Sequence, residues 1–187
     1  MDVPSKFLLE GIDHVGKDTL AAGIQNRLGY HLVLHYTKPL ALEYYAEGPS
    51  TPERRYQEAS FCTMFEVLGN LRTAKVILNR THLGEAVYGP LYRQYSGDYV
   101  FELERKYELQ KVRDVRLILL TEDFDRAGHF VDDGESLGGV DKRPHEQALF
   151  IGAFERSIIT DKRVICVTDR VSGGFRDVGA ILDEALV

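Results

Sequence analysis

The chain has few of the residues that mark secreted, metal-stapled or membrane proteins. Its 187 residues contain no tryptophan, two methionines and two cysteines, Cys62 and Cys166. Two cysteines exclude a disulfide framework and a cysteine-rich zinc site, and such scarcity is typical of a reducing compartment. No apolar run approaches the roughly 18 residues of a membrane helix, and residues 1–13 lack the pattern of a secretory signal. We therefore expect a cytoplasmic protein without a membrane partner.

Positive charge is also scarce. The 23 lysines and arginines face 29 acidic residues, which gives a formal net charge of −6. This balance disfavours broad binding to a nucleic-acid backbone, so we expect no nucleic-acid partner, but it permits a local basic pocket for a small anion. Hydrophobic residues make up 44% of the chain, which is enough for a core and excludes intrinsic disorder. At this length we expect one domain over residues 1–187.

Five short apolar runs predict β-strands. Each run is rich in β-branched or large aliphatic residues, and each is continuous rather than alternating, as in a parallel sheet covered on both faces. The runs are Phe7–Leu9, Leu32–Leu34, Val76–Leu78, Leu117–Leu120 and Val164–Val167.

Helical patterns separate these runs. Leu20, Ile24 and Leu28 repeat every four residues, and Gly29 follows where a helix end favours a left-handed residue. A further helix is predicted from the start signal at residues 50–53 to about Leu68. Segment 98–110 is predicted as a solvated helix, and residues 149–158 and 178–186 carry apolar stripes. Alternating strands and helices predict an α/β protein with a five-stranded parallel sheet between helical layers. The glycine-rich and acidic segment 128–139 reads as a mobile loop.

The segment Gly11–Lys17 carries the strongest chemical motif. Its spacing is G-x-x-x-x-G-K, directly after the first predicted strand and before the first helix. Such glycines let backbone N–H groups turn inward around a polyphosphate, the helix N-terminus adds partial positive charge, and Lys17 reaches the outer phosphates. The following residue is usually a serine or threonine that ligates Mg²⁺. Here it is Asp18, a hard oxygen ligand that can also hold Mg²⁺, or that can instead cap the helix.

The rest of the chain narrows the type of phosphate-loop protein. Switch GTPases read guanine with N-K-x-D, which this sequence lacks, and the chain is small for a motor ATPase. A nucleoside kinase must deprotonate a hydroxyl and usually places a carboxylate after the second strand. This chain has Lys38 there, which favours an anionic acceptor unless Lys38 is merely a solvated loop residue. A small kinase for a phosphate acceptor remains.

The phosphate loop also resembles that of a known family. Residues 9–17, LEGIDHVGK, are similar to the E-G-x-D-x-x-G-K loop of thymidylate kinases, and residues 77–80, ILNR, are similar to the D-R motif after that family's third strand. Residues 16–19 resemble the loop of some phage deoxynucleotide kinases, and residues 80–93 resemble viral thymidylate-kinase-like proteins. The resemblance implies a three-layer P-loop kinase fold with a short lid at about 124–145. It also implies host cytoplasm if the protein is viral, and a homodimer.

The resemblance assigns roles to individual residues. Lys17 would bridge the β- and γ-phosphates of ATP, Arg80 would hold the acceptor monophosphate with its fork of donors, and Asp13 would accept a hydrogen bond from the sugar 3′-hydroxyl. The family's aspartate before that arginine, which orders the water around Mg²⁺, is replaced by Asn79. Asp18 could supply the missing negative charge. Both are therefore candidate metal-site residues.

The remaining candidates are weaker, because each has an ordinary structural explanation. The family stacks an aromatic residue on the base, and Phe65 is in the matching helix. The arginine expected one turn later is absent, however, and the sequence favours a core position for Phe65. Candidate ATP-binding residues are Gly11, His14, Val15, Gly16, Lys17, Asp18, Thr19, Arg126 and Arg143. Candidate acceptor-binding residues are Asp13, Lys38, Phe65, Arg80, Tyr88, Tyr92 and Arg93.

The function predicted from the sequence is transfer of the γ-phosphoryl group of ATP, with Mg²⁺, to dTMP or a related deoxynucleoside monophosphate. Lys17 and Arg80 are the predicted catalytic residues. Two alternatives remain open at this point. The first is a kinase for a modified pyrimidine, either as a nucleotide or within DNA. The second is a nucleotide-binding regulator without activity, for which Asp18 and Asn79 are the suggestive departures from the family pattern.

Overall fold

The computed structural model describes residues 3–29, 31–35, 52–70, 73, 75–126 and 139–187. Its centre is a five-stranded parallel sheet with strand order β2-β3-β1-β4-β5. The predicted α/β class is confirmed, and each apolar run lies in a strand except for Val167, which follows the last one. The strands are β1 (Lys6–Glu10), β2 (Leu32–His35), β3 (Val76–Asn79), β4 (Val115–Thr121) and β5 (Asp161–Cys166).

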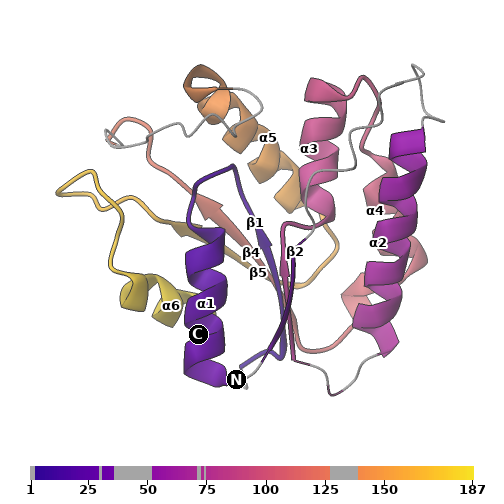
Figure 1. Cartoon of the computed structure of the whole chain (residues 1–187), viewed down its shortest axis with the longest axis horizontal. Coiled ribbons are helices and arrows are strands. Elements are labelled where there is room, and N and C mark those ends of the chain that lie inside the picture. The colour runs from indigo at the N-terminus through magenta and orange to yellow at the C-terminus, as the bar shows by residue number, and fades with distance from the viewer. Residues whose placement is uncertain (1–2, 30, 36–51, 71–72, 74, 127–138) are drawn as a thin grey trace.

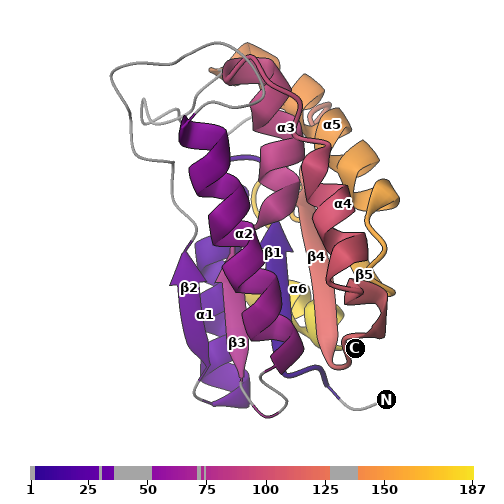
Figure 2. The same ribbon diagram turned by 90° about the vertical axis from the view of Figure 1, so that its right-hand side faces the viewer.

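Helices cover both faces of the sheet, which gives three layers (Figure 1). One layer pairs α1 with α6, and the other holds the remaining four α-helices of the described residues, which face the viewer in Figure 2. The bounds are α1 (Lys17–Leu28), α2 (Pro52–Asn70), α3 (His82–Tyr92), α4 (Tyr99–Lys106), α5 (Arg143–Arg156) and α6 (Val178–Leu186), with short 3₁₀ helices η1 (Leu109–Lys111) and η2 (Val140–Lys142). No helix in the described ranges is both long and apolar enough to cross a membrane.

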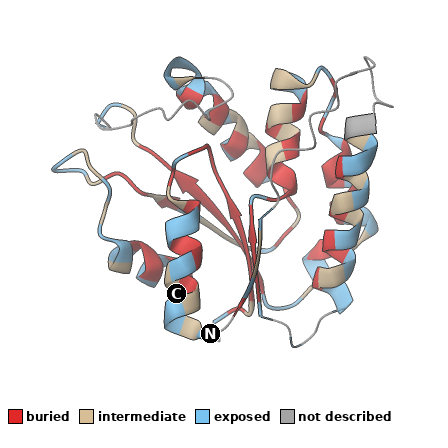
Figure 3. Ribbon diagram, in the orientation of Figure 1, coloured by how far each residue is buried: buried red, intermediate tan, exposed pale blue. Residues whose placement is uncertain are grey.

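Burial follows the layers (Figure 3). The three inner strands, β1, β3 and β4, are buried along their whole length because helices cover both of their faces. The edge strands β2 and β5 are only partly buried, so the prediction of strands covered on both faces holds for the centre of the sheet alone.

Segment 98–110 differs from the solvated helix predicted for it. The helix α4 ends at Lys106, and Val100, Phe101 and Leu103 within it are buried. Glu102, Arg105 and Lys106 are exposed, whereas Glu104 is buried and accepts from His82, so the charged residues of this helix are not confined to solvent. The stripe predicted over 149–158 ends earlier than expected as well, because α5 stops at Arg156. Most of the predicted lid, and Lys38, lie outside the described residues.

The parallel arrangement brings the carboxyl ends of the strands to one edge of the sheet, where open α/β folds place their ligands. The phosphate loop follows β1 at this edge, and Arg80 follows β3 next to it. Glu122 follows β4 on the other side of β1. The fold therefore gathers residues that are more than 100 positions apart in the sequence.

Arg116 is buried on β4 and links this strand to β5 and α6. Its Nε donates to both carboxylate oxygens of Asp161, at 3.1 and 2.9 Å. Its terminal nitrogen donates to the carbonyl oxygen of Ala185 at 2.9 Å. The guanidinium thereby connects β4 with β5 and with the last turn of α6.

Removing the partner of this buried cation should be costly. We expect Asp161→Ala to lower the free energy of unfolding by about 2 kcal/mol, less than for a fully buried pair because Asp161 is partly exposed. The matched control is Asp183→Ala, which removes an exposed partner of Arg27 and should cost under about 0.5 kcal/mol. Urea unfolding of both variants measures the difference, and equal costs would contradict this account of Arg116.

Candidate phosphate-binding site

The phosphate loop has the backbone geometry of an anion-binding turn. Gly11 and Gly16 have φ values of 139° and 89°, and His14 has 62°, so three residues adopt positive φ within one short loop. Ile12 and Val15 are fully buried and fix the loop to the core. The loop ends at Gly16, the N-cap of α1, so the positive end of the helix dipole lies beside it.

Lys17 lies inside this turn and is only 5% exposed. Its Nζ donates to two carbonyl oxygens of the loop, those of Gly11 at 2.8 Å and Ile12 at 2.6 Å. A buried ammonium needs such partners, because an unpaired charge away from water is very costly. The lysine is therefore positioned within the loop by the loop's own backbone.

The electrostatic surroundings of Lys17 make its charge easy to lose. Burial, and after it the Arg80 guanidinium, lower the pKa of Lys17 from its ordinary 10.5 to about 8. The carboxylates of Asp13, Glu10 and Asp18 act in the opposite direction. An anion bound in the loop would favour the charged form in the same way as these carboxylates do.

Arg80 lies across from the lysine. It follows β3 with a positive φ of 63°, and its backbone N–H donates to the carbonyl of Leu9 at 3.0 Å, which holds it beside the loop. Its guanidinium lies 3.0 Å from a carboxylate oxygen of Asp13. The arginine side chain is 44% exposed, so its remaining N–H donors can reach a ligand. The structure thus brings together Lys17, Asp13 and Arg80, the central residues of the sequence prediction.

Glu10 is a site residue whose role the sequence analysis missed. Its buried Oε1 accepts hydrogen bonds from the backbone N–H groups of Thr81 at 3.1 Å and Leu83 at 2.9 Å, and from the Thr81 hydroxyl. A carboxylate at a helix N-terminus pairs with free N–H groups and with the helix dipole. Glu10 therefore connects the end of β1 to the start of α3 and sets the position of Arg80. The sequence did carry one signal for this role, because Glu10 is an acidic residue directly after the apolar run of the first strand.

The two candidate metal-site residues are in direct contact. The Asn79 amide nitrogen donates to Asp18 Oδ1 at 2.6 Å, and His35, at the end of β2, lies 3.5 Å from the same oxygen. Asn79 Oδ1 is buried and has no hydrogen-bond donor among the described residues. Asp18 is 81% exposed and carries a second oxygen. No three His, Cys, Asp or Glu side chains of the described ranges could hold a metal together. Two hard oxygen donors fit Mg²⁺, which keeps several waters and phosphate oxygens as ligands.

The tyrosines of α3, Tyr88 and Tyr92, lie near enough to the loop to feel the charge of Asp13. The hydroxyl of Tyr88 is buried without a hydrogen-bond partner in the described part of the chain. Burial raises the pKa of Tyr88, and the nearby carboxylates of Asp13 and Glu146 raise it further, so the phenol stays protonated. Tyr92 donates its hydroxyl hydrogen to Glu146 on α5. Of the two, Tyr88 has the hydroxyl that can still serve a ligand.

The other predicted basic residues contact protein groups. Arg93 pairs with Glu85, and Arg126 donates to the carbonyl oxygen of Arg170 at 2.6 Å. Arg143 is buried, pairs with Glu122 at 2.8 Å, and donates to the carbonyl oxygen of Asp13 at 2.8 Å. Arg143 therefore stabilises the loop through a protein contact at Asp13, which the sequence did not indicate.

The last candidates divide between surface and core. His14, Asp18 and Thr19 are exposed at the loop and at the start of α1. Phe65 is fully buried in α2, with its ring edge against His82 at a centroid distance of 4.9 Å. This environment is that of a core residue, and its predicted contact with a base has no further support here.

Solved structures with the same architecture are kinases or bind nucleotides, whereas no protein-family model and no curated protein matches the sequence. The YorR protein of Bacillus subtilis, crystallised with phosphorylated GDP, matches with a TM-score of 0.56 and 16% identity over 89% of this chain and 88% of that one. Deoxyadenosine kinase of M. mycoides, with the products dCMP and dCDP bound, matches with a TM-score of 0.54 and 17% identity over 95% of both chains. Thymidylate kinase of Candida albicans matches with a TM-score of 0.52 and 14% identity over 97% of this chain and 88% of that one. At these identities the similarity establishes the fold, which is that of the P-loop kinases.

The two loop glycines provide a matched test of this geometry. Both have positive φ, but a Cβ on Gly11 would lie 2.5 Å from the carbonyl oxygen of Leu120, whereas nothing lies within 4 Å of one on Gly16. We expect Gly16→Ala to cost about 1 kcal/mol of folding free energy from backbone strain alone. Gly11→Ala should cost at least about 2 kcal/mol more, because β4 must also move. Thermal or urea unfolding measures both, and similar costs would contradict the close approach of the loop to β4.

Proposed function

We propose that this protein is an ATP-dependent nucleoside monophosphate kinase. Its preferred acceptor is dTMP or a related deoxynucleoside monophosphate, and its products are ADP and the nucleoside diphosphate. The observation that carries the proposal is that two cations, Lys17 and Arg80, lie near the same carboxylate, that of Asp13. Lys17 lies within a loop suited to a polyphosphate, and Arg80 lies outside it, 3.0 Å from Asp13. Lys17 would bind the phosphates of ATP, and Arg80 would bind the phosphate of the acceptor nucleotide.

The charges of the site suit a phosphate acceptor better than a hydroxyl acceptor. A monophosphate presents an oxygen that is already ionised, so no general base is required. Catalysis then consists of aligning two anions that repel each other and of stabilising charge on the transferred group. Lys17 would hold the outer phosphates of ATP, and Arg80 would hold the acceptor phosphate and offset the repulsion. No carboxylate is needed in the transfer step, which agrees with Glu10 and Asp13 being engaged with protein donors.

Mg²⁺ is the metal that the donor set fits. Asp18 and Asn79 would hold it, directly or through water, beside the start of α1. Bound there, the ion would neutralise charge on the ATP phosphates. His35 lies at the same position and would orient the Asp18 carboxylate.

The residues around Asp13 suit a sugar-phosphate acceptor. Tyr88 places a protonated hydroxyl in charged surroundings that include Asp13 and Arg80. Asp13 retains one carboxylate oxygen besides the one that contacts Arg80, and that oxygen would accept from a sugar hydroxyl. The similarity to the thymidylate kinase structure supports this class of substrate. The base would be chosen by residues beyond these.

A nucleotide-binding regulator is the second candidate. The observation that favours it is the hydrogen bond from Asn79 to Asp18, which occupies one of the oxygens that a metal would use. Such a protein would bind ATP in the loop and transfer nothing. The kinase for a modified pyrimidine shares the site described above and differs from the main proposal only in the acceptor.

The main proposal predicts ADP release with ATP, Mg²⁺ and at least one common deoxynucleoside monophosphate in a coupled assay. Lys17→Ala and Arg80→Ala should each lower kcat/KM by about 10²- to 10³-fold, since each removes a cation that stabilises the transferring phosphate. The loss in Arg80→Ala should include a higher KM for the acceptor but not for ATP.

Arg105→Ala is the matched control, because Arg105 is exposed on α4 away from the loop, and it should retain full activity. ATP binding without transfer to any monophosphate would reject the kinase and favour the regulator. Activity on oligonucleotides alone would point to a modified base in DNA.

The proposed metal site predicts a rescue. Asp18→Ser should raise the Mg²⁺ concentration needed for half-maximal activity by about tenfold, since a carboxylate is lost from the first turn of α1. Adding Asn79→Asp, which restores a negative charge in contact with that position, should recover most of this loss. A Mg²⁺ titration of the single and double variants measures it. Losses that simply add would show that the two residues do not share a metal.

A further inference from the structure

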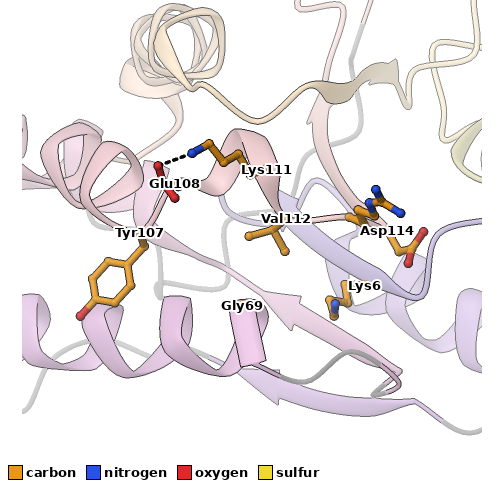
Figure 4. A pocket seen from close by; sticks show the side chains of 8 residues that line it. Lys6, Gly69, Tyr107, Glu108, Lys111, Val112 and Asp114 are labelled. Atoms are coloured by element: carbon orange, nitrogen blue, oxygen red, sulfur yellow. Dashed lines mark hydrogen bonds and ion pairs between the residues drawn. The ribbon is translucent and has the colours of Figure 1, made fainter.

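A second cavity lies at the opposite end of the sheet from the phosphate loop. It has a volume of about 680 Å³ and is lined by the start of β1, the last turn of α2, and the segment from Tyr107 to Asp114 that leads into β4 (Figure 4). Because β1 begins at Lys6 and ends at Glu10, the whole length of the strand separates this cavity from the loop. The volume is within the range of small-molecule sites.

Lys6 is the unusual residue in this cavity. Its side chain belongs to the cavity wall, yet the residue is only 3% exposed. Among the residues that the structure describes, none accepts a hydrogen bond from its ammonium or lies within ion-pair distance of it. Burial lowers its pKa, and only the more distant Asp114 carboxylate acts to raise it. The rest of the Lys6 side chain is buried, and its ammonium keeps contact with solvent at the cavity rather than with an acceptor among the described residues.

The other charged residues of the wall leave an excess of positive charge. Lys111 and Glu108 form an ion pair with each other, which Figure 4 shows as a dashed line. The remaining charged groups are Lys6, Arg113 and Asp114, two cations and one anion. In the described part of the chain no acceptor pairs with the Arg113 side chain. Lys6 and Arg113 line the same cavity, where the backbone N–H of Lys6 donates to the carbonyl oxygen of Asp114 at 3.0 Å.

We propose that this cavity is a second ligand site, which binds the phosphate group of a small phosphorylated molecule between Lys6 and Arg113. An ammonium and a guanidinium at one cavity wall recognise a phosphate through charge-assisted hydrogen bonds. The cavity is larger than a phosphate ion needs, so the rest of the molecule lies along Tyr107 and Val112. The site is independent of the phosphate loop, and it does not rest on the proposed kinase activity.

NMR of protein labelled with ¹³C at lysine Cε tests the site, with the Lys6 resonance identified by its loss in Lys6→Met. Inorganic phosphate and glycerol 3-phosphate are titrated separately at constant ionic strength, against sodium chloride. We expect a saturable shift of the Lys6 signal with half-saturation at about millimolar concentration. Arg113→Gln should weaken it at least tenfold, whereas Arg105→Gln, an exposed change on α4, should leave it unaltered.

The outcomes separate the site from its alternatives. Tighter binding of glycerol 3-phosphate identifies an organic phosphomonoester as the ligand, and equal binding identifies free phosphate. A response that matches chloride, or a saturable one that Arg113→Gln leaves intact, overturns the proposal. So does a response that disappears in Lys17→Ala, because the signal would then report on the phosphate loop.

Discussion

The buried ammonium of Lys17 is the group on which the site depends. It cannot lie 5% exposed in a protein interior without acceptors, and the loop supplies them as the carbonyl oxygens of Gly11 and Ile12. The loop in turn can present those carbonyls only because Gly11 takes a φ of 139° under the backbone of β4. The shape of the loop and the position of Lys17 therefore depend on each other. A bound polyphosphate would replace carbonyl oxygens with charged ones.

The surrounding acids give this arrangement its rigidity. Glu10 connects β1 to the start of α3, and Glu122 holds Arg143 against the back of the loop. Each is buried and satisfied by donors, so each acts through position rather than through proton transfer. Asp13 has a different part, since it contacts Arg80 on one side and borders Tyr88 on the other. Backbone carbonyls thus hold Lys17 and a carboxylate holds Arg80, and the two cations lie close enough for Arg80 to lower the pKa of Lys17.

Local sequence was informative where local physics decides the structure. Continuous apolar runs predicted the strands, and G-x-x-x-x-G-K with Arg80 predicted side chains that the structure brings close together. Long-range partners could not be read in this way: nothing near Arg143 indicates that it packs beneath Asp13, 130 residues away. The same holds for the contact of Asn79 with Asp18 and for the burial of Phe65 against His82. The missed inner face of α4 has a different cause, since half of its residues are charged and one of these, Glu104, is itself buried.

The central claim is that Lys17 exchanges its loop carbonyls for the phosphates of ATP, and its low pKa makes that exchange measurable. With a pKa of about 8 in the free protein, Lys17 is mostly neutral at pH 8.5 and must gain a proton when a polyphosphate restores its charge. Calorimetry of MgATP binding at pH 8.5, in buffers of different ionisation enthalpy, should show a net uptake of protons on binding. Lys17→Arg, which stays charged, should show none. Binding without proton uptake in the unaltered protein would contradict the claim, because the lysine would then not be the group that meets the phosphates.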